Sequence, residues 1–198
     1  RLPQRPLYPL DEVLTAHGMT VRQEGALLFC GGKLRPGAFS LPGDVSSQYI
    51  SGLLMALPLA AQDTTLTVND LKSRPYIDMT IGLLKNFGID IKHNDYRQFF
   101  IEGGQRYVPT RYRIEGDWSA AATLLVAGAV AGEVTLHNVS ILSKQADTAV
   151  CTALVRAGAE LIHEADRITV RRRPLRAFEF DATQCPDLFP PLAALAAA

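Results

Sequence analysis

Several features that mark other protein classes are scarce in this 198-residue sequence. Its three cysteines, Cys30, Cys151 and Cys185, are far apart and form no Cys-x-x-Cys pair. The four histidines stand at no metal-ligand spacing from these cysteines, so the sequence predicts neither a disulfide framework nor a metal site. We therefore expect a reduced, cytoplasmic protein without a structural metal.

Charge of one sign and long apolar runs are also missing. Twenty basic residues balance twenty acidic ones, so no overall positive field favours nucleic acid or an anionic membrane surface. The longest apolar runs, such as Ala120–Ala131, are too short to span a bilayer. Any anionic ligand must therefore be held by local groups.

The sequence does contain an internal repeat, with copies about seventy residues apart. In the first copy, Gly43–Ser47 opens an apolar helix, Thr64–Val68 alternates like a strand, and Ser73–Asp78 opens an amphipathic helix. The corresponding segments of the second copy are Gly116–Ala120, Glu133–Val139 and Ser143–Asp147. Each copy closes with two short strands, predicted at 90–93 and 98–102, and at 160–163 and 167–171. The pattern predicts an α/β fold of repeated β-α-β-α-β-β units.

Parts of two further copies flank the complete ones. A helix at Leu10–His17 with strands at Thr20–Arg22 and Ala26–Cys30 would end an earlier copy. A strand at Phe178–Asp181 and a helix at Pro186–Ala198 would begin a later one. Because such units bury their helices by stacking, we expect the chain to be an internal piece of a larger protein.

The chain is predicted to contribute to two lobes. Gly103-Gly104 and Pro109 interrupt the pattern and suggest a join near residues 111–115, since glycine and proline mark loops. We assign residues 1–114 to a first lobe, with a partial and a complete unit, and residues 115–198 to a second lobe, with a complete unit and the start of another. One continuous domain is the alternative.

The start of the first apolar helix carries groups suited to an anion. Ser46, Ser47 and Gln48 lie where a strand gives way to the helix, and Asp44 or Ser46 is a suitable N-cap. Unpaired N–H groups and the positive end of the helix dipole attract phosphate or carboxylate there. The alternative is that these serines only cap the helix.

The next helix begins in a similar way, with Ser73-Arg74-Pro75-Tyr76. Pro75 suits the first helical turn. Ser73 can either cap the helix or bind a phosphate, Arg74 offers a guanidinium group, and Tyr76 offers a ring face and a hydroxyl. A simple cap beside a solvated arginine is the alternative.

Asp187 follows Pro186 at the start of the last predicted helix. It is a candidate general base or hydroxyl-orienting carboxylate, and the alternative is an ordinary first-turn carboxylate stabilised by the helix dipole. Arg1 is a terminal cation that carries no information by itself.

Together these segments resemble the 5-enolpyruvylshikimate-3-phosphate synthase family, in the family's order and at about its spacing. The combination of Ser-Ser-Gln with Ser-basic-Pro-Tyr is specific, whereas either motif alone would be weak. The matching stretches are Gly43–Tyr49 with Leu53–Ala56, Ser73–Thr80, Glu115–Ser119 and Pro186-Asp187.

The resemblance implies a two-lobed "inside-out" α/β barrel with three units per lobe, incomplete in this chain. It also implies transfer of the enolpyruvyl group of phosphoenolpyruvate to the 5-hydroxyl of shikimate 3-phosphate, without a cofactor or metal. By position, Asp187 would be the proton acceptor, Arg1 would bind phosphoenolpyruvate, and Gln48 would also reach it. The residues implied to hold shikimate 3-phosphate are Ser46, Ser47, Gln48, Ser73 and Tyr76.

The sequence also departs from the family pattern. The family's amino-terminal Lys-Ser pair, its glycine-rich loop before Arg1 and its cations beyond Ala198 are absent, and Gln184-Cys185 stands where a histidine-hydrophobic pair is frequent. We therefore expect this chain to be inactive alone. Exposed faces of its units predict that it self-associates, and we expect its parent to be a monomer. The alternatives are UDP-N-acetylglucosamine enolpyruvyl transferase and a non-catalytic anion-binding α/β module.

Overall fold

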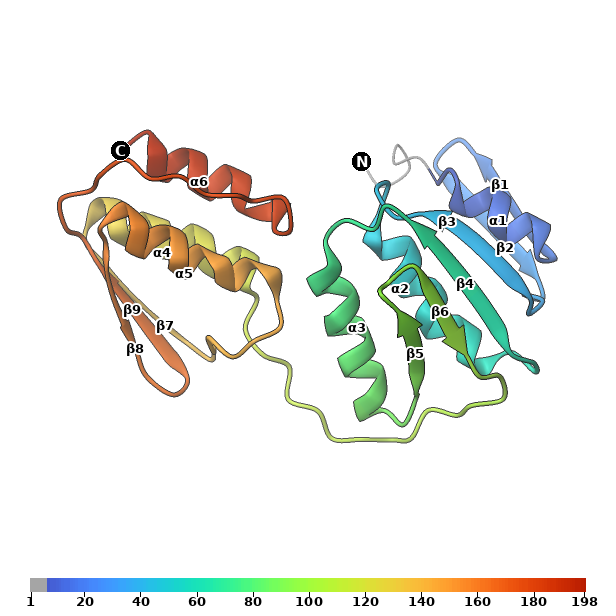
Figure 1. Cartoon of the computed structure of the whole chain (residues 1–198). Helices are drawn as coiled ribbons and strands as arrows, with labels where there is room; N and C mark the ends of the chain where they lie inside the picture. Colours follow the sequence, from blue (N-terminus) through green and yellow to red (C-terminus); the bar gives the residue numbers. More distant parts are fainter. Residues whose placement is uncertain (1–6) are drawn as a thin grey trace. The chain divides into compact units, whose positions relative to one another are not determined.

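A computed structural model describes residues 7–198 of the chain (Figure 1). Its internal contacts divide the chain into two compact units, Arg1–Thr110 and Arg111–Ala198. Each unit is described by itself below. The assignment of these units to two lobes of a larger barrel stays a prediction.

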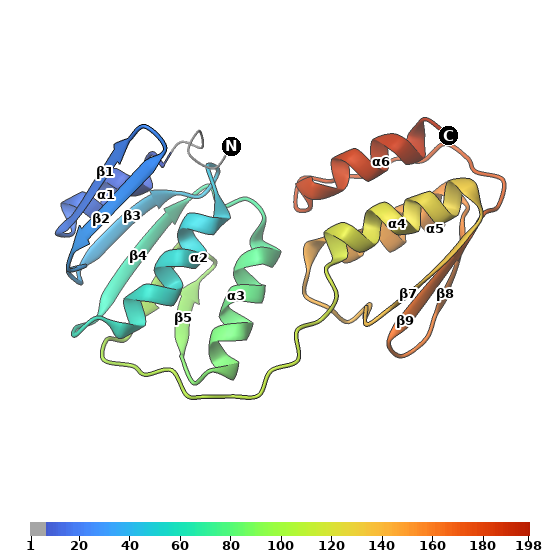
Figure 2. The ribbon, with the colours of Figure 1, turned by 180° about the vertical axis from the view of Figure 1, so that it is seen from behind.

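The first unit is built on a four-stranded sheet in the order β3-β4-β6-β5. β3 and β4 are parallel, whereas β6 is antiparallel to both of its neighbours. Helices α2 and α3 lie side by side over one face of this sheet (Figure 2). The bounds are β3 Ala38–Pro42, α2 Ser47–Ala56, a 3-10 turn Leu57–Leu59, β4 Thr64–Asn69, α3 Arg74–Asn86, β5 Ile91–Asn94 and β6 Gln98–Ile101.

Alternation of side chains along the strands creates the core of this unit. Leu66 and Val68 on β4 are buried, while Thr65 and Thr67, which alternate with them, are only half-buried. Successive strand residues point to opposite faces, so the apolar set of each strand lies under the helices. The helices contribute the buried side chains Ile50, Leu53, Leu54, Ile77 and Leu84.

A helix and a two-stranded ribbon precede this sheet, as the sequence predicts. They are α1 (Leu10–Ala16), β1 (Met19–Glu24) and β2 (Leu27–Gly32). β1 and β2 are antiparallel and, among the strands of residues 7–198, pair only with each other. All of β2 is exposed. In the two complete copies, the equivalent closing strands join a third strand, β4 or β7.

In the second unit, helices α4 and α5 lie over one face of a sheet with the order β7-β9-β8, and α6 packs against α4 on the side away from the sheet (Figure 1). The long helix α4 is central, and Trp118 and Leu125 on it are fully buried. The bounds are α4 Trp118–Ala131, β7 Glu133–His137, a 3-10 turn Ala146–Ala149, α5 Val150–Ala157, β8 Glu160–His163, β9 Arg167–Arg171, a 3-10 turn Pro186–Leu188 and α6 Phe189–Ala196.

The repeat is therefore confirmed in its helices and closing strands, but two expected strands are not formed. The strand predicted at Phe178–Asp181 is wrong, because residues 172–182 contain no strand. A strand needs a hydrogen-bonding neighbour, and no described strand follows α6 to pair with it as β4 pairs with β3. The opening strand of the second copy is also absent. Residues 111–116 form no strand, although the Gly116 N–H donates to Asn138 O and the Arg113 side chain donates to Asn138 Oδ1, just after β7.

The described helices include none that is both long and apolar enough to cross a membrane.

Candidate functional site

Two helix starts meet at one edge of the first unit's sheet. The parallel strands β3 and β4 end opposite each other, at the pair Pro42 and Asn69, and each is followed by a helix. The Gly43 N–H donates to Asn69 O at 2.6 Å, and Gly43 O accepts from the Lys72 N–H at 3.2 Å. Both helix N-termini therefore lie at the carboxyl edge of parallel strands, which is the usual place for ligands in α/β sheets.

The close approach of these two loops depends on Gly43. A Cβ atom at this position would lie 2.5 Å from the Leu71 Cα and 2.8 Å from the Leu71 N. No residue other than glycine fits against a backbone at that distance. The glycine of the first motif therefore sets the spacing between the two helix starts.

Ser46 is the N-cap of α2, which decides between the two candidates that the sequence allowed. Its backbone is extended, with φ −163° and ψ 122°, and its Oγ accepts a hydrogen bond from the Gln48 N–H at 3.2 Å. Ser46 and Ser47 are half-buried and Gln48 is exposed. Two hydroxyls and an amide thus surround the positive end of the α2 dipole.

Ser73 precedes α3 in an unusual conformation. Its φ of 55° and ψ of 44° are left-handed, and its side chain makes no capping hydrogen bond. Of the two roles that the sequence allowed, capping is therefore excluded. The left-handed region costs a residue other than glycine about 1–2 kcal/mol. Such strain is found where a site requires it.

Hydroxyl groups one turn further along tie the two helices together. Thr80 is 5% exposed and its Oγ1 donates to Tyr76 O at 2.9 Å. Because that proton is used, Ser51 Oγ donates to Thr80 Oγ1 at 2.8 Å. This chain of bonds fixes Tyr76 and the start of α3 relative to α2.

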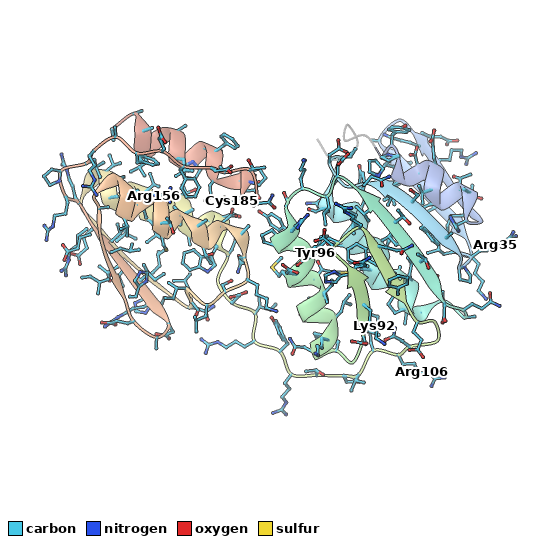
Figure 3. The ribbon with its side chains drawn as sticks, in the orientation of Figure 1. Arg35, Lys92, Tyr96, Arg106, Arg156 and Cys185 are labelled. Atoms are coloured by element: carbon cyan, nitrogen blue, oxygen red, sulfur yellow. The ribbon has the colours of Figure 1, made fainter. Side chains whose placement is uncertain are left out.

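Arg74 is directed toward the turn between β5 and β6. Its Nη1 lies 3.7 Å from Asp95 Oδ1, and its guanidinium carbon lies 5.2 Å from the centre of the Tyr96 ring. The Tyr96 hydroxyl donates to Asp78 Oδ1 on α3 at 2.6 Å. This hydrogen bond, with burial and the negative charge of Asp78, raises the pKa of Tyr96. Figure 3 labels Tyr96 beside α3.

The second unit carries Asp187 in the 3-10 turn before α6, where it is exposed. The preceding Cys185 is 4% exposed, and burial, followed by the charges of Asp147 and Asp181, raises the pKa of its thiol. A raised pKa disfavours the reactive thiolate. Cys185, labelled in Figure 3, is a buried side chain packed in the core of the second unit.

The start of α4 corresponds to that of α2 in the repeat, but it is not a similar site. Its N-cap is Asp117, whose Oδ1 accepts from the Ser119 N–H at 2.9 Å and the Ala120 N–H at 3.4 Å. A carboxylate already occupies the first-turn donors and balances the helix dipole. The sequence alignment of the two motifs did not reveal this difference.

The structure brings together five of the predicted site residues, on the first unit. Asp187 lies on the second unit, and Arg1 lies outside the described residues. Among residues 7–198, no group of His, Cys, Asp or Glu side chains could hold a metal ion. The residues gathered at the carboxyl edge of β3 and β4 are Ser46, Ser47, Gln48, Ser73 and Tyr76.

Solved structures show which class of protein has this fold. The chain matches EPSP synthase from Acinetobacter baumannii with a TM-score of 0.72 and 26% identity, over 96% of this chain and 45% of that one. It matches the enolpyruvyl transferase NikO from Streptomyces tendae with a TM-score of 0.72 and 21% identity, over 98% and 49% of the two chains. The second likeness shows the fold alone. The fold is that of the enolpyruvyl transferases.

The family follows from sequence comparison. Residues 1–198 match the family model of EPSP synthase (3-phosphoshikimate 1-carboxyvinyltransferase), so the chain belongs to the EPSP synthase family. It is 37% identical over 200 residues to the 3-phosphoshikimate 1-carboxyvinyltransferase of Clostridium perfringens, covering 99% of this chain and 47% of that protein. The chain is 34% identical to the Clostridioides difficile protein of the same name, covering 98% of this chain and 45% of that protein. The chain thus spans about half the length of the curated relatives that it matches.

These comparisons confirm the resemblance and the fold class that the motifs predicted. The match is to the EPSP synthase family, and the relatives named above are 3-phosphoshikimate 1-carboxyvinyltransferases.

Proposed function

We propose that this chain is part of an enzyme that transfers the enolpyruvyl group of phosphoenolpyruvate to the 5-hydroxyl of shikimate 3-phosphate and releases phosphate. The observation that carries the proposal is the pair of helix starts, α2 and α3, at one carboxyl edge of the sheet. The names of the relatives support it, since they are 3-phosphoshikimate 1-carboxyvinyltransferases. The reaction belongs to the shikimate pathway, which supplies aromatic amino acids.

The helix starts suit the phosphate of shikimate 3-phosphate. Ser46 and Ser47 would donate hydroxyl groups to its oxygens, next to the positive end of α2. Hydrogen bonds to a charged partner contribute about 1.5–3 kcal/mol each. Ser73, which does not cap its own helix, would add a third hydroxyl, and the Tyr76 ring would lie against the shikimate ring. Gln48 would face both substrates.

The chemistry is an addition followed by an elimination. The 5-hydroxyl oxygen adds to C2 of phosphoenolpyruvate while the hydroxyl proton passes to a base and the methylene carbon gains a proton. The tetrahedral intermediate then loses that proton and phosphate, which restores the double bond. We assign the role of base to Asp187, and contact with phosphoenolpyruvate to Arg1. The protein must also hold several negative charges together, and fixed dipoles of helix N-termini serve this purpose.

The chain alone should not complete this reaction. It spans about half of its relatives, and the cations that the family contributes outside this span would be needed for phosphoenolpyruvate. We expect activity only after the missing segments are supplied, in a cytoplasmic enzyme that acts as a monomer. A purely anion-binding module would stay inactive after the same addition.

The decisive experiment is a calorimetric titration of the chain with shikimate 3-phosphate. We expect weak binding that Ser47→Ala reduces by about tenfold or more, since a lost hydrogen bond to an anion contributes at least one factor of ten. Ser40→Ala is the matched control, because Ser40 is exposed on β3, away from the helix starts. Equal binding by Ser47→Ala and wild type would contradict the site, and so would no binding by a chain shown to be folded.

A further inference from the structure

We propose that the turn between β5 and β6 clamps Arg74 and thereby holds Ser73 in its left-handed conformation, so that Asp95 and Tyr96 are positioning residues of the anion site. The consequence for ligand binding rests on the proposed function, whereas the clamp itself does not. The inference starts from the strain at Ser73, with φ of 55° and no capping bond from its side chain to stabilise it.

Both neighbours of Ser73 are fixed by other parts of the unit. On the amino-terminal side, the Lys72 N–H donates to Gly43 O at 3.2 Å. On the carboxyl-terminal side, Arg74 lies 3.7 Å from Asp95 and over the ring of Tyr96. A strained residue persists only where its surroundings impose its conformation, and these two anchors meet that requirement.

The clamp holds α3 at two points, one turn apart. Arg74 is the first helical residue, and Asp78 accepts the Tyr96 hydroxyl bond at 2.6 Å. The Arg74–Asp95 pair by itself is weak, since the side chains are 48% and 59% exposed. The stacked ring and the bond to a carboxylate add to it. We therefore expect the clamp to shift a local equilibrium and not to decide whether the chain folds.

The turn is rigid enough for this task. Asp95 and Tyr96 both have positive φ, 46° and 57°, and the Arg97 N–H closes the turn by donating to Asn94 O at 2.9 Å. These are the features of a tight hairpin turn. The Tyr96 ring also lies 4.4 Å from the His93 ring, centre to centre. The turn thus presents Asp95 and Tyr96 in fixed positions.

The second copy of the repeat shows what happens without a clamp. There Gln145 precedes the 3-10 turn that leads into α5, with an ordinary φ of −64° and ψ of 130°. The corresponding hairpin turn keeps its arginine, Arg167, paired with its own Glu164. Left-handed backbone and clamp therefore occur together in the first copy, whose α2 start lacks the carboxylate cap found in the second.

The clamp matters because Ser73 has an alternative. With negative φ, a serine at this place is a favourable N-cap whose oxygen accepts from the first helical turn. The Ser73 hydroxyl would then be engaged in capping α3 and would not be available to a ligand. By preventing this, the clamp leaves the Ser73 hydroxyl to a ligand.

Nuclear magnetic resonance of the 198-residue chain tests the clamp directly, through the backbone coupling and carbon shifts of Ser73. In wild type we expect values for positive φ. In Arg74→Ala and in Asp95→Asn we expect averaging toward negative φ, with partial recovery in Arg74→Lys. Arg97→Ala is the matched control, since Arg97 also lies 3.7 Å from Asp95 but belongs to the turn itself and not to α3. Unchanged positive φ in both Arg74→Ala and Asp95→Asn would overturn the proposal.

Titration with shikimate 3-phosphate separates the clamp from the proposed function. If the wild-type chain binds, Arg74→Ala should weaken binding by about three- to tenfold, in proportion to the lost population of the competent conformation, and Arg97→Ala should not. If the wild-type chain does not bind, the proposed preformed site fails, and the Ser73 signals still decide whether the clamp exists.

Discussion

The starts of α2 and α4 occupy equivalent places in the two copies of the repeat, yet only one is suited to an anion. Each follows a glycine whose N–H donates to an asparagine carbonyl, Gly43 to Asn69 at 2.6 Å and Gly116 to Asn138 at 2.8 Å. The caps differ. Ser46 caps α2 with a neutral hydroxyl, and Asp117 caps α4 with a carboxylate.

The repeat sets the position of each helix N-terminus, whereas a single capping residue decides whether that N-terminus is already balanced by a negative charge. The β-α-β-α-β-β unit brings a helix N-terminus to the sheet edge, where its dipole favours negative charge. With a neutral cap, a bound ligand can supply the negative charge, whereas a carboxylate cap supplies it as part of the protein. A similar contrast exists between the helices of each unit. Ser51 and Thr80 form a neutral pair in the first unit, whereas Ser119, in the first turn of α4, donates to the buried Asp147 in the second.

The largest expected effect comes from breaking the shared glycine contact. In Gly116→Ala, the new Cβ would lie 2.6 Å from Asn138 O, so we expect a loss of about 1–3 kcal/mol from overpacking. The single tryptophan, Trp118, is buried beside it and reports unfolding of the second unit in urea. Gly43→Ala should leave that transition unchanged while lowering the first unit's stability by a similar amount.

Gly52→Ala is the control for these substitutions. Gly52 lies within α2 and a Cβ there would meet nothing within 4 Å, so alanine should stabilise the helix by up to about 1 kcal/mol. A destabilised Gly52→Ala chain would mean that the glycine effects are not steric.

The next largest expected loss of stability comes from breaking the side-chain hydrogen bonds Ser51–Thr80 and Ser119–Asp147. Ser119→Ala should cost about 2 kcal/mol, because it removes a hydrogen bond from a carboxylate that is 2% exposed. Ser51→Ala should cost about 1 kcal/mol, since the lost bond is neutral. Urea unfolding of the two variants compares them, and equal losses would show that the charge of Asp147 does not distinguish the two copies.

Exchanging the cap should convert one helix start into the other. Asp117→Ala should lose about 1 kcal/mol, whereas Asp117→Ser should retain most of the stability. In Asp117→Ser, added inorganic phosphate should shift the amide signals of Ser119 and Ala120, which the wild-type carboxylate occupies. Phosphate-induced shifts of the same size in wild type would disprove the role of the cap.

The smallest effect is a dependence on alkaline pH. The hydrogen bond to Asp78 raises the pKa of Tyr96 above its usual value of 10.0. A raised folded-state pKa contributes stability that is complete below pH 10 and is lost as pH rises through the folded value. We expect Tyr96→Phe to remove this part of the decline in urea stability above pH 10. Tyr107→Phe is the comparison, because burial alone raises the pKa of Tyr107.

A substantial part of the fold could be predicted from local patterns. The helix at Ser47–Ala56 and the strand at Thr64–Asn69 follow from apolar periodicity and from the polar residues at their ends, which act within a few residues of chain. The strand expected at Phe178–Asp181 failed because a strand depends on a neighbour, and none is present among the described residues.

The candidate site, like the fold, could be predicted from the sequence only in part. The sequence by itself determined that serines stand at two helix starts, because motif and capping chemistry are local. Only the tertiary structure decided that Ser46 caps its helix and Ser73 does not, and that Tyr96 and Asp95 lie against Arg74. The conformation of Ser73 and the contacts of Arg74 depend on segments some twenty or more residues apart, which only the folded unit brings together.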